Sequence, residues 1–422
     1  MTPRHVSIWG ALTCLLAACG PGAPGHTASA SSSGSGSAAS SDATAPPSTG
    51  GPGPTAASAS EPAVTDTDPG PDTAPTTTAT SSADTGPSHD DTSDTDIPPQ
   101  PGVPLDQFTC ADARWRFVEP TLSSPANARV DSRGHLRLTS HWALLEFDET
   151  GALVGQIEVP PPWGWGGIDA ADNFYVSFLD EGAARKGLRK LAVTGESLWQ
   201  TDRGPAQAND FSGRVTVAPD GTTLIAGRND TRAERYDPAG ALVWDKTLAD
   251  KRFDDPFAMN TAGVAAAIRY GVDGAVLALA PDASVLWERP FGSRGRAFAD
   301  IDEGGVVVAA SLSWPPHVIR LASDGAVLWD KTIELPMLAD GHVSAVATNE
   351  VGAIALAIGA TLHDTQVALA LRLGPDGEVT ALHACDPTSD GQGIALDEAG
   401  TIYLAGVVWA EDGEHLFAVA LE

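Results

Sequence analysis

The hydrophobic pattern after residue 105 consists of short runs of aliphatic and aromatic residues, separated by turn signals rich in Gly and Asp. One stretch, Ser323-Asp-Gly-Ala-Val-Leu-Trp-Asp-Lys331, has related copies that end near Trp199, Trp244 and Trp287. Together with Trp329, these tryptophans are spaced by 45, 43 and 42 residues. Self-similarity with a period of roughly 40–45 residues is typical of the blades of a β-propeller.

A second motif alternates with the first and reads apolar residue, Asp or Asn, two residues, then Gly, with small variations. Its seven copies begin at Val130, Ile168, Val217, Met259, Ile301, Thr348 and Leu396. Asp and Asn side chains accept hydrogen bonds from the backbone two residues on, and Gly adopts positive φ without a steric penalty. Each copy therefore predicts a hairpin between two strands, and each Asp-Gly before a Leu-Trp predicts another.

Two hairpins per repeat give four strands, which we name A to D from the propeller axis outward. The sequence therefore predicts an all-β fold, a seven-bladed β-propeller of four-stranded blades. The last repeat supplies three strands before the sequence ends, and the stretch Ala113-Arg-Trp-Arg-Phe-Val118 resembles the missing D strand, with Trp115 in the position of the repeat tryptophan. We expect this N-terminal strand to complete the last blade and remove its open edge. A Trp at one fixed place in each blade is expected to pack between sheets.

The first 19 residues have the pattern of an export signal. A short basic start and an apolar run over residues 6–18 lead to Leu16-Ala-Ala-Cys19, which resembles the lipobox of bacterial lipoproteins. The resemblance implies cleavage before Cys19, lipidation of its thiol and stable membrane anchoring through several acyl chains. Gly20, in place of an Asp, suggests the outer membrane, with the protein facing the periplasm or the cell exterior.

Residues 20–104 consist mainly of Ser, Thr, Ala, Gly, Pro and Asp, with ten acidic residues and no Lys or Arg. Such a composition buries too little apolar surface to offset chain entropy, so we expect a disordered linker that tethers the propeller. The chain then divides into a signal peptide (1–19), a linker (20–104) and a propeller (105–422). The formal net charge of −30 argues against nucleic acid and anionic lipid surfaces as partners.

The stretch from Leu191 to Trp199 resembles the tryptophan-docking repeat of the pyrroloquinoline-quinone-like propellers. That superfamily includes quinoprotein dehydrogenases, which carry an adjacent cysteine pair and a calcium-ligand cluster. Neither feature is visible here, so no cofactor and no metal are expected. The superfamily also includes the non-enzymatic propeller lipoprotein of the outer-membrane β-barrel assembly machinery, which is similar in architecture, although it is usually drawn with eight blades.

Cys110 and Cys385 are the thiols that remain in the propeller. Export to an oxidising compartment favours a disulfide between them. The register argues against it, because Cys110 is expected at a C–D turn and Cys385 near the opposite rim, about 17–20 Å away. A disulfide requires Cα atoms within about 7 Å. The sequence leaves this pairing open.

No motif of a metalloprotease, a serine hydrolase or a phosphate-binding loop is present in the propeller, and no catalytic residue is assigned. We therefore expect a non-catalytic binding or scaffolding module with a protein or carbohydrate partner. The alternatives are a lyase or hydrolase acting on polysaccharide or cell-wall material, and a factor in outer-membrane protein assembly. A His, an Arg and a Tyr or Asp converging at one channel mouth would favour the enzyme.

The repeat also predicts which face binds. In a four-stranded blade the D–A and B–C connections share one face, and the A–B and C–D turns share the other. Aromatic and basic residues collect on the first face: Trp142, Trp163, Trp165, Trp314, Trp409, Arg185, Arg228, Arg269, Arg294 and Arg296. Trp and Arg dominate binding hot spots, and aromatic faces stack on sugar rings. We expect this face, around the channel mouth, to hold the partner or an anionic ligand.

Overall fold

A computed structural model describes residues 109–110, 112–119, 122, 125–140, 143–158, 166–180, 185–205, 214–226, 232–248, 253–269, 274–291, 297–311, 314–336, 338, 340–362, 364–386 and 388–422. Cys19, the predicted signal peptide and the predicted linker therefore lie outside the described residues. Within these ranges, no helix is long and apolar enough to cross a membrane.

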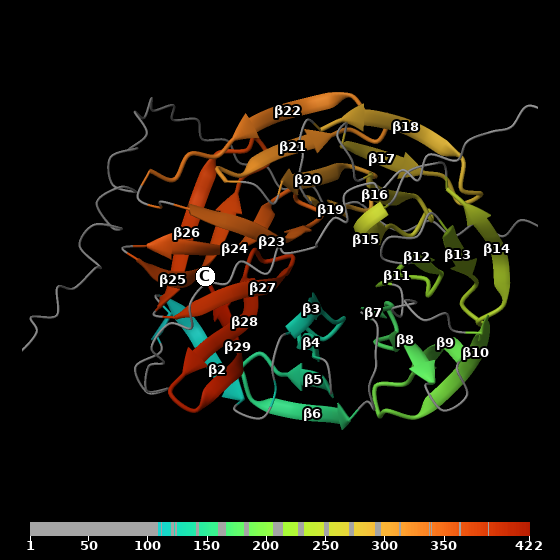
Figure 1. Cartoon of the computed structure of the whole chain (residues 1–422), viewed down its shortest axis with the longest axis horizontal. Coiled ribbons are helices and arrows are strands. Elements are labelled where there is room, and N and C mark those ends of the chain that lie inside the picture. The colour runs from blue at the N-terminus through green and yellow to red at the C-terminus, as the bar shows by residue number, and fades with distance from the viewer. Residues whose placement is uncertain are drawn as a thin grey trace, which may run out of the picture. The chain divides into compact units, whose positions relative to one another are not determined.

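The described strands form seven antiparallel sheets arranged in a ring, as Figure 1 shows. Blade one contains β3 (Pro125–Val130), β4 (Leu136–Ser140), β5 (Ala143–Phe147) and β6 (Leu153–Glu158), and blade two contains β7 (Gly167–Ile168), β8 (Phe174–Asp180), β9 (Arg185–Leu191) and β10 (Ser197–Pro205). Blade three contains β11 (Arg214–Val217), β12 (Thr223–Ala226), β13 (Arg232–Tyr236) and β14 (Leu242–Thr247), and blade four contains β15 (Phe253–Met259), β16 (Ala265–Arg269), β17 (Ala275–Leu279) and β18 (Val285–Pro290).

Blade five contains β19 (Ala297–Ile301), β20 (Val307–Ser311), β21 (His317–Leu321) and β22 (Val327–Thr332). Blade six contains β23 (Asp340–Thr348), β24 (Ile354–Leu362), β25 (Thr365–Leu373) and β26 (Val379–Asp386), with β1 (Thr109–Cys110) added outside β26. Blade seven contains β27 (Ser389–Leu396), β28 (Ile402–Ala410), β29 (Gly413–Leu421) and β2 (Ala113–Glu119). The prediction of a seven-bladed, all-β propeller is confirmed.

The A–B turns have the chemistry that the sequence predicts. In blade one, the backbone N–H groups of Arg133 and His135 each donate a hydrogen bond to Oδ1 of Asp131 at 2.9 Å. Gly134 closes the turn with a φ of +79°. The same side-chain acceptor, from Asp or Asn, closes the corresponding turns at Asp169, Asn260, Asp302, Asn349 and Asp397. The turn Asp and Asn residues therefore have a structural role.

The repeat tryptophans connect neighbouring blades. The indole Nε1 of Trp199, on the D strand of blade two, donates to the carbonyl of Pro238 in the C–D turn of blade three at 3.1 Å. Trp244, Trp287 and Trp329 donate in the same way to carbonyls of the next blade, at 2.8, 2.8 and 2.7 Å. The tryptophans thus join neighbouring blades, as their periodic position predicts.

The ring closes through the N-terminal strand. β2 pairs with β29 from Ala113 opposite Leu421 to Glu119 opposite Leu416. Trp115 is buried and stacks with Phe147 of blade one, at 5.9 Å between ring centroids. The first and last blades therefore share one core, which confirms the predicted closure.

Cys110 and Cys385 form a disulfide with a Cα–Cα distance of 4.0 Å. The register argument against this pairing was wrong because it placed Cys110 at the rim of blade seven. Cys110 instead belongs to β1, which pairs with β26 and brings the two cysteines directly opposite each other. The disulfide spans 275 residues, and a loop of this size is worth about 5–6 kcal/mol in the loop-entropy model.

Changing Gly151 to Ala tests the closure contact. Gly151 has a φ of +81°, and a Cβ there would lie 2.4 Å from the Trp115 ring. Gly134 has a φ of +79°, and a Cβ there would meet nothing within 4 Å, so Gly134→Ala is a control with the same backbone strain. We expect Gly151→Ala to lower the free energy of unfolding by about 1–3 kcal/mol more than Gly134→Ala, because only the former displaces Trp115. Equal denaturation midpoints for the two variants would contradict a closure that depends on this contact.

Candidate functional site in the central channel

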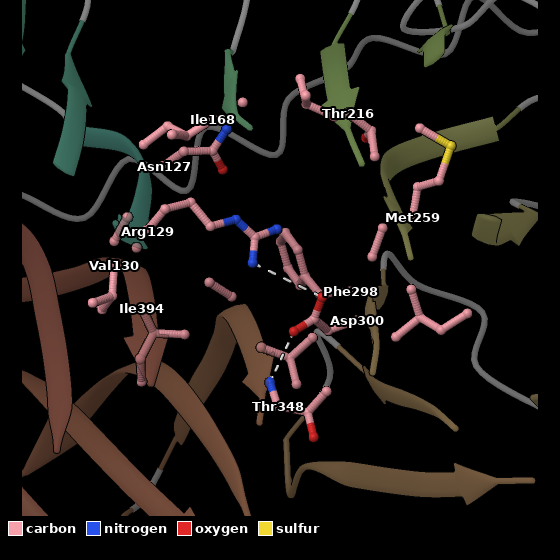
Figure 2. A pocket seen from close by; sticks show the side chains of 18 of the residues that line it. Asn127, Arg129, Val130, Ile168, Thr216, Met259, Phe298, Asp300, Thr348 and Ile394 are labelled. Atoms are coloured by element: carbon pink, nitrogen blue, oxygen red, sulfur yellow. Dashed lines mark hydrogen bonds and ion pairs between the residues drawn. The ribbon is translucent and has the colours of Figure 1, made fainter. Parts of the chain in front are cut away.

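The innermost strands of all seven blades surround a channel with a volume of about 830 Å³. Small and aliphatic side chains line much of it because seven A strands converge on one axis and leave little room. Figure 2 shows Met259 and Phe298 on one side of the channel and Val130 and Ile394 on another. Acidic residues of the A–B turns also line it, and two contacts between charged groups lie on the A strands themselves.

The first is an ion pair that crosses the channel. Arg129 on β3 of blade one extends toward Asp300 on β19 of blade five, and its Nη1 lies 4.0 Å from Oδ1 of Asp300 (Figure 2). The other carboxylate oxygen accepts a hydrogen bond from the backbone N–H of Thr348 at 2.8 Å. Burial raises the pKa of the Asp300 carboxyl, while the charge of Arg129 and the Thr348 hydrogen bond oppose this change.

The repeat could have revealed this pair. Arg129 and Asp300 both stand two residues before the A–B turn residue of their blades. The other five blades hold only small residues at this position, namely Gly167, Thr216, Ala258, Ala347 and Ala395. Five blades therefore fold without a charge at this place, so the two charges are not a requirement of the propeller.

The second contact lies between blades six and seven. Oδ1 of Asp390 on β27 is buried, accepts no hydrogen bond from the described residues, and lies 3.5 Å from Nε2 of His342 on β23. Burial raises the pKa of the Asp390 carboxyl, while nearby His342 and a hydrogen bond from Gln392 oppose the change. Gly359 of β24 leaves the space for this carboxylate, because a Cβ there would lie 1.8 Å from Oδ1.

The strands of blades six and seven explain where this pair lies. β23 and β24 are nine residues long, whereas β19 and β20 of blade five are five residues long. The additional residues are at the start of the A strand and the end of the B strand, which is the side of the D–A and B–C connections. His342 and Asp390 stand on these extensions, so they lie at the channel mouth of the predicted binding face.

Blade one carries a dense ionic cluster on the opposite face. One ligand atom from each of Asp131, His135 and Glu146 lies within 4.8 Å of the others. Arg137 binds both carboxylates, at 3.0 Å to Asp131 and 2.7 Å to Glu146, and Arg133 binds them at 2.8 and 2.7 Å. These arginines already neutralise the carboxylates, so we interpret the cluster as an ionic network that stabilises the turn.

The structure locates four of the predicted face residues. Arg185 pairs with Asp202 on the D strand of blade two. Arg269 pairs with Glu288 on the D strand of blade four. Trp314 is half-buried against the core of blades five and six, and Trp409 is half-buried near the end of β28. Trp142, Trp163, Trp165, Arg228, Arg294 and Arg296 lie outside the described residues. On this face the structure instead brings together His342 and Asp390, and the sequence assigned neither of them to a site.

Comparison with known proteins supports the fold. A family model described as "Outer membrane protein assembly factor BamB" matches residues 176–267, which fall in blades two to four. A search among curated proteins finds no match.

Solved structures with a similar fold have unrelated roles. A streptogramin B lyase is 14% identical, with 72% of this chain and 97% of that chain covered and a TM-score of 0.50. A catalytically inactive virginiamycin B lyase from Staphylococcus aureus, solved with quinupristin, is 14% identical, with coverage of 75% and 100% and a TM-score of 0.53. A chain of a mitotic checkpoint complex is 9% identical, with coverage of 77% and 96% and a TM-score of 0.56. At these identities, the likeness shows the propeller fold alone.

Asp390 provides a test of the cost of the buried carboxylate. Folding raises the pKa of the Asp390 carboxyl, so the protonated carboxyl favours the folded state. This contribution to stability is fully present below the pKa of an unfolded Asp, about 3.9, and is lost as the pH rises through the folded pKa. Asp390→Asn should therefore raise the melting temperature by a few degrees near pH 7.5, and the difference from wild type should shrink toward about pH 4.

The charged groups that act on Asp390 are His342 on β23, which opposes the pKa change, and Glu414 on β29, which adds to it. Asp364→Asn, at an exposed turn between β24 and β25, is the control and should show no such pH-dependent gain. A lower melting temperature for Asp390→Asn near neutral pH would show that the carboxylate stabilises the fold and contradict this account.

Proposed function

We propose that this protein is a membrane-tethered lipoprotein whose propeller is a non-catalytic binding module at the outer membrane or cell surface. The observation that carries this proposal is the pair of charged contacts inside the channel. Arg129–Asp300 and His342–Asp390 lie on the A strands that line the channel, and both carboxylates are desolvated. Charged groups whose pKa is shifted by burial and that lie in a cavity are candidates for binding function.

The binding surface in this proposal is the face of the D–A and B–C connections. The long strands of blades six and seven form one side of the channel mouth there, and Trp409 lies near the end of β28 on the same side. The match of blades two to four to the BamB family model favours a protein partner over a carbohydrate. A role in outer-membrane protein assembly is the more specific form of this proposal.

An enzyme is the second candidate, because His342 and Asp390 lie together at this mouth. A polysaccharide lyase would need a further cation or phenol to stabilise the developing negative charge. Among the described residues that line the channel, Arg129 is the one arginine, and it pairs with Asp300. The described geometry therefore supports binding better than catalysis.

The lipid anchor can be tested by phase separation of the full chain. The wild-type protein should partition into the detergent phase with a mature terminus at Cys19, because several acyl chains hold it there. Cys19→Ala should leave the protein unprocessed or move it to the aqueous phase. Wild-type protein in the aqueous phase, with an ordinary cleaved terminus, would show that there is no lipid anchor.

The binding face can be tested by chemical cross-linking in intact cells followed by purification of the tagged full chain. Trp409→Ala combined with Arg185→Ala should reduce cross-linked partner about tenfold or more, as expected for hot-spot residues. Glu350→Ala combined with Glu196→Ala, at exposed turns of the other face that do not line the channel, is the matched control and should leave the yield unchanged. Loss of cross-linking in the control pair alone, with melting temperatures unchanged, would assign the partner to the other face.

A further inference from the structure

A buried histidine lies at the place where the N-terminal segment closes the ring. β1 pairs with the outer edge of blade six and β2 with the outer edge of blade seven, so the chain crosses from one blade to the other between these two strands. His383 on β26 lies between Leu382 and Ala384, which face the core between blades five and six. Successive side chains of a strand point to opposite faces, so His383 faces blade seven, as Cys385 does. The core on that side, which we call the blade six–seven seam, contains Ala368, Cys385, Leu404, Val419 and Leu421.

The imidazole of His383 has no hydrogen bond in this seam. The residue is 5% exposed, and neither Nδ1 nor Nε2 has a partner among the described residues. Asp112, at the crossing between β1 and β2, places its Oδ2 3.9 Å from Nδ1, beyond the usual N–H···O distance of about 2.7–3.2 Å. The Asp112 side chain is 78% exposed. The carboxylate beside His383 therefore lies on the solvent side of the crossing, and the imidazole lies beneath it.

The closed seam suits the neutral imidazole. Burial lowers the pKa of His383, the charge of Arg372 on β25 adds to this change, and the charge of Asp112 opposes it. Blade seven presents aliphatic side chains such as Leu404 and Val419 to the seam. Protonation would give the ring two N–H donors and a charge, with no described acceptor within hydrogen-bond distance. Burying unpaired donors and charge is costly, so the protonated ring favours a more open seam.

We infer that His383 is an acid-sensitive latch of the ring, and that its protonation opens the blade six–seven seam at the crossing between β1 and β2. The imidazolium turns from the apolar seam toward Asp112 and solvent, and the crossing moves to let it pass. The disulfide keeps β1 attached to β26, so the opening is confined to the crossing and β2. Blades six and seven form one side of the channel mouth, so a looser seam also alters that mouth. This inference does not depend on the lipid anchor or on a partner.

The direction of the pH dependence follows from the lowered pKa. In the opened form, the imidazole binds a proton with the pKa of a solvent-exposed histidine, about 6.5, and in the closed form it binds the proton less readily. The closed seam is therefore fully stable above about pH 6.5 and loses stability as the pH falls through the folded pKa. Between pH 7.5 and 5.5, the opening equilibrium can rise by up to about tenfold, which is the limit for one proton.

The test is hydrogen–deuterium exchange of the full chain in detergent at pH 7.5 and 5.5, with each amide rate divided by its intrinsic rate at that pH. In the wild type, protection of the β2 and β26 amides should fall several-fold at pH 5.5, and protection of β16 and β17 in blade four should not. His383→Leu and His383→Gln should each abolish the fall, because neither side chain titrates. His317→Leu, at a partly exposed histidine paired with Asp330, is the matched control and should retain it. Asp390 is unchanged in all these variants, so the comparison isolates His383.

Three outcomes would overturn the inference. The first is equal wild-type protection of β2 and β26 at the two pH values. The second is a fall that persists in both His383 variants, which would assign the pH dependence to another group. The third is an equal fall in β16 and β17, which would show that acid destabilises the whole ring and not the seam.

Discussion

The contact between each D-strand tryptophan and the next blade's C–D turn holds this propeller together. A four-stranded sheet of this size buries little by itself, so each blade is stable only against its neighbours. The indole supplies both a large apolar surface and an N–H donor, and at Trp287 and Trp329 these meet a glycine of the next turn and a backbone carbonyl. Because the partner is backbone, the contact can be repeated with different turn sequences.

The closing blade uses the same contact with one difference. Trp115 packs on Gly151 as Trp199, Trp287 and Trp329 pack on their turn glycines, but its indole N–H is buried without a partner among the described residues. Its ring compensates with contacts to Phe147 and Tyr403, from the two blades that it joins. Closure therefore depends more on aromatic packing than on the hydrogen bond used elsewhere in the ring.

The sequence predicts the repeated features and misses the irregular ones, for physical reasons. The tryptophans, the turn Asp and Gly residues and the closing strand recur at a fixed spacing, so each copy supports the others. The channel charges appear once each, and they were visible only as departures from the repeat at Arg129 and Asp300. The sequence left the disulfide open because its register did not foresee β1, a fifth strand that no other described blade has. The repeat also hid which residues are exposed: the Val-Leu pair before Trp287 and Trp329 looks like part of a core, yet Val327 and Leu328 are each 53% exposed. A β-bulge explains this, since Val327 pairs with Leu321 and Trp329 with Arg320, which leaves Leu328 without a partner on the outermost strand. Such bulges twist an edge away from regular pairing and so discourage edge-to-edge association.

The disulfide has a particular consequence for a tethered propeller. The chain enters at β1, is joined to blade six through Cys110 and Cys385, and only then forms the closing strand β2. In the proposed tethered state, a pull on the N-terminal side reaches the covalent link before it reaches the hydrogen bonds between β2 and β29. Those hydrogen bonds are what close the ring, and a pull along the chain would otherwise act on them first. The fifth strand and its disulfide thus separate the mechanical load of an anchor from the noncovalent closure on which the channel, and every contact inside it, depends.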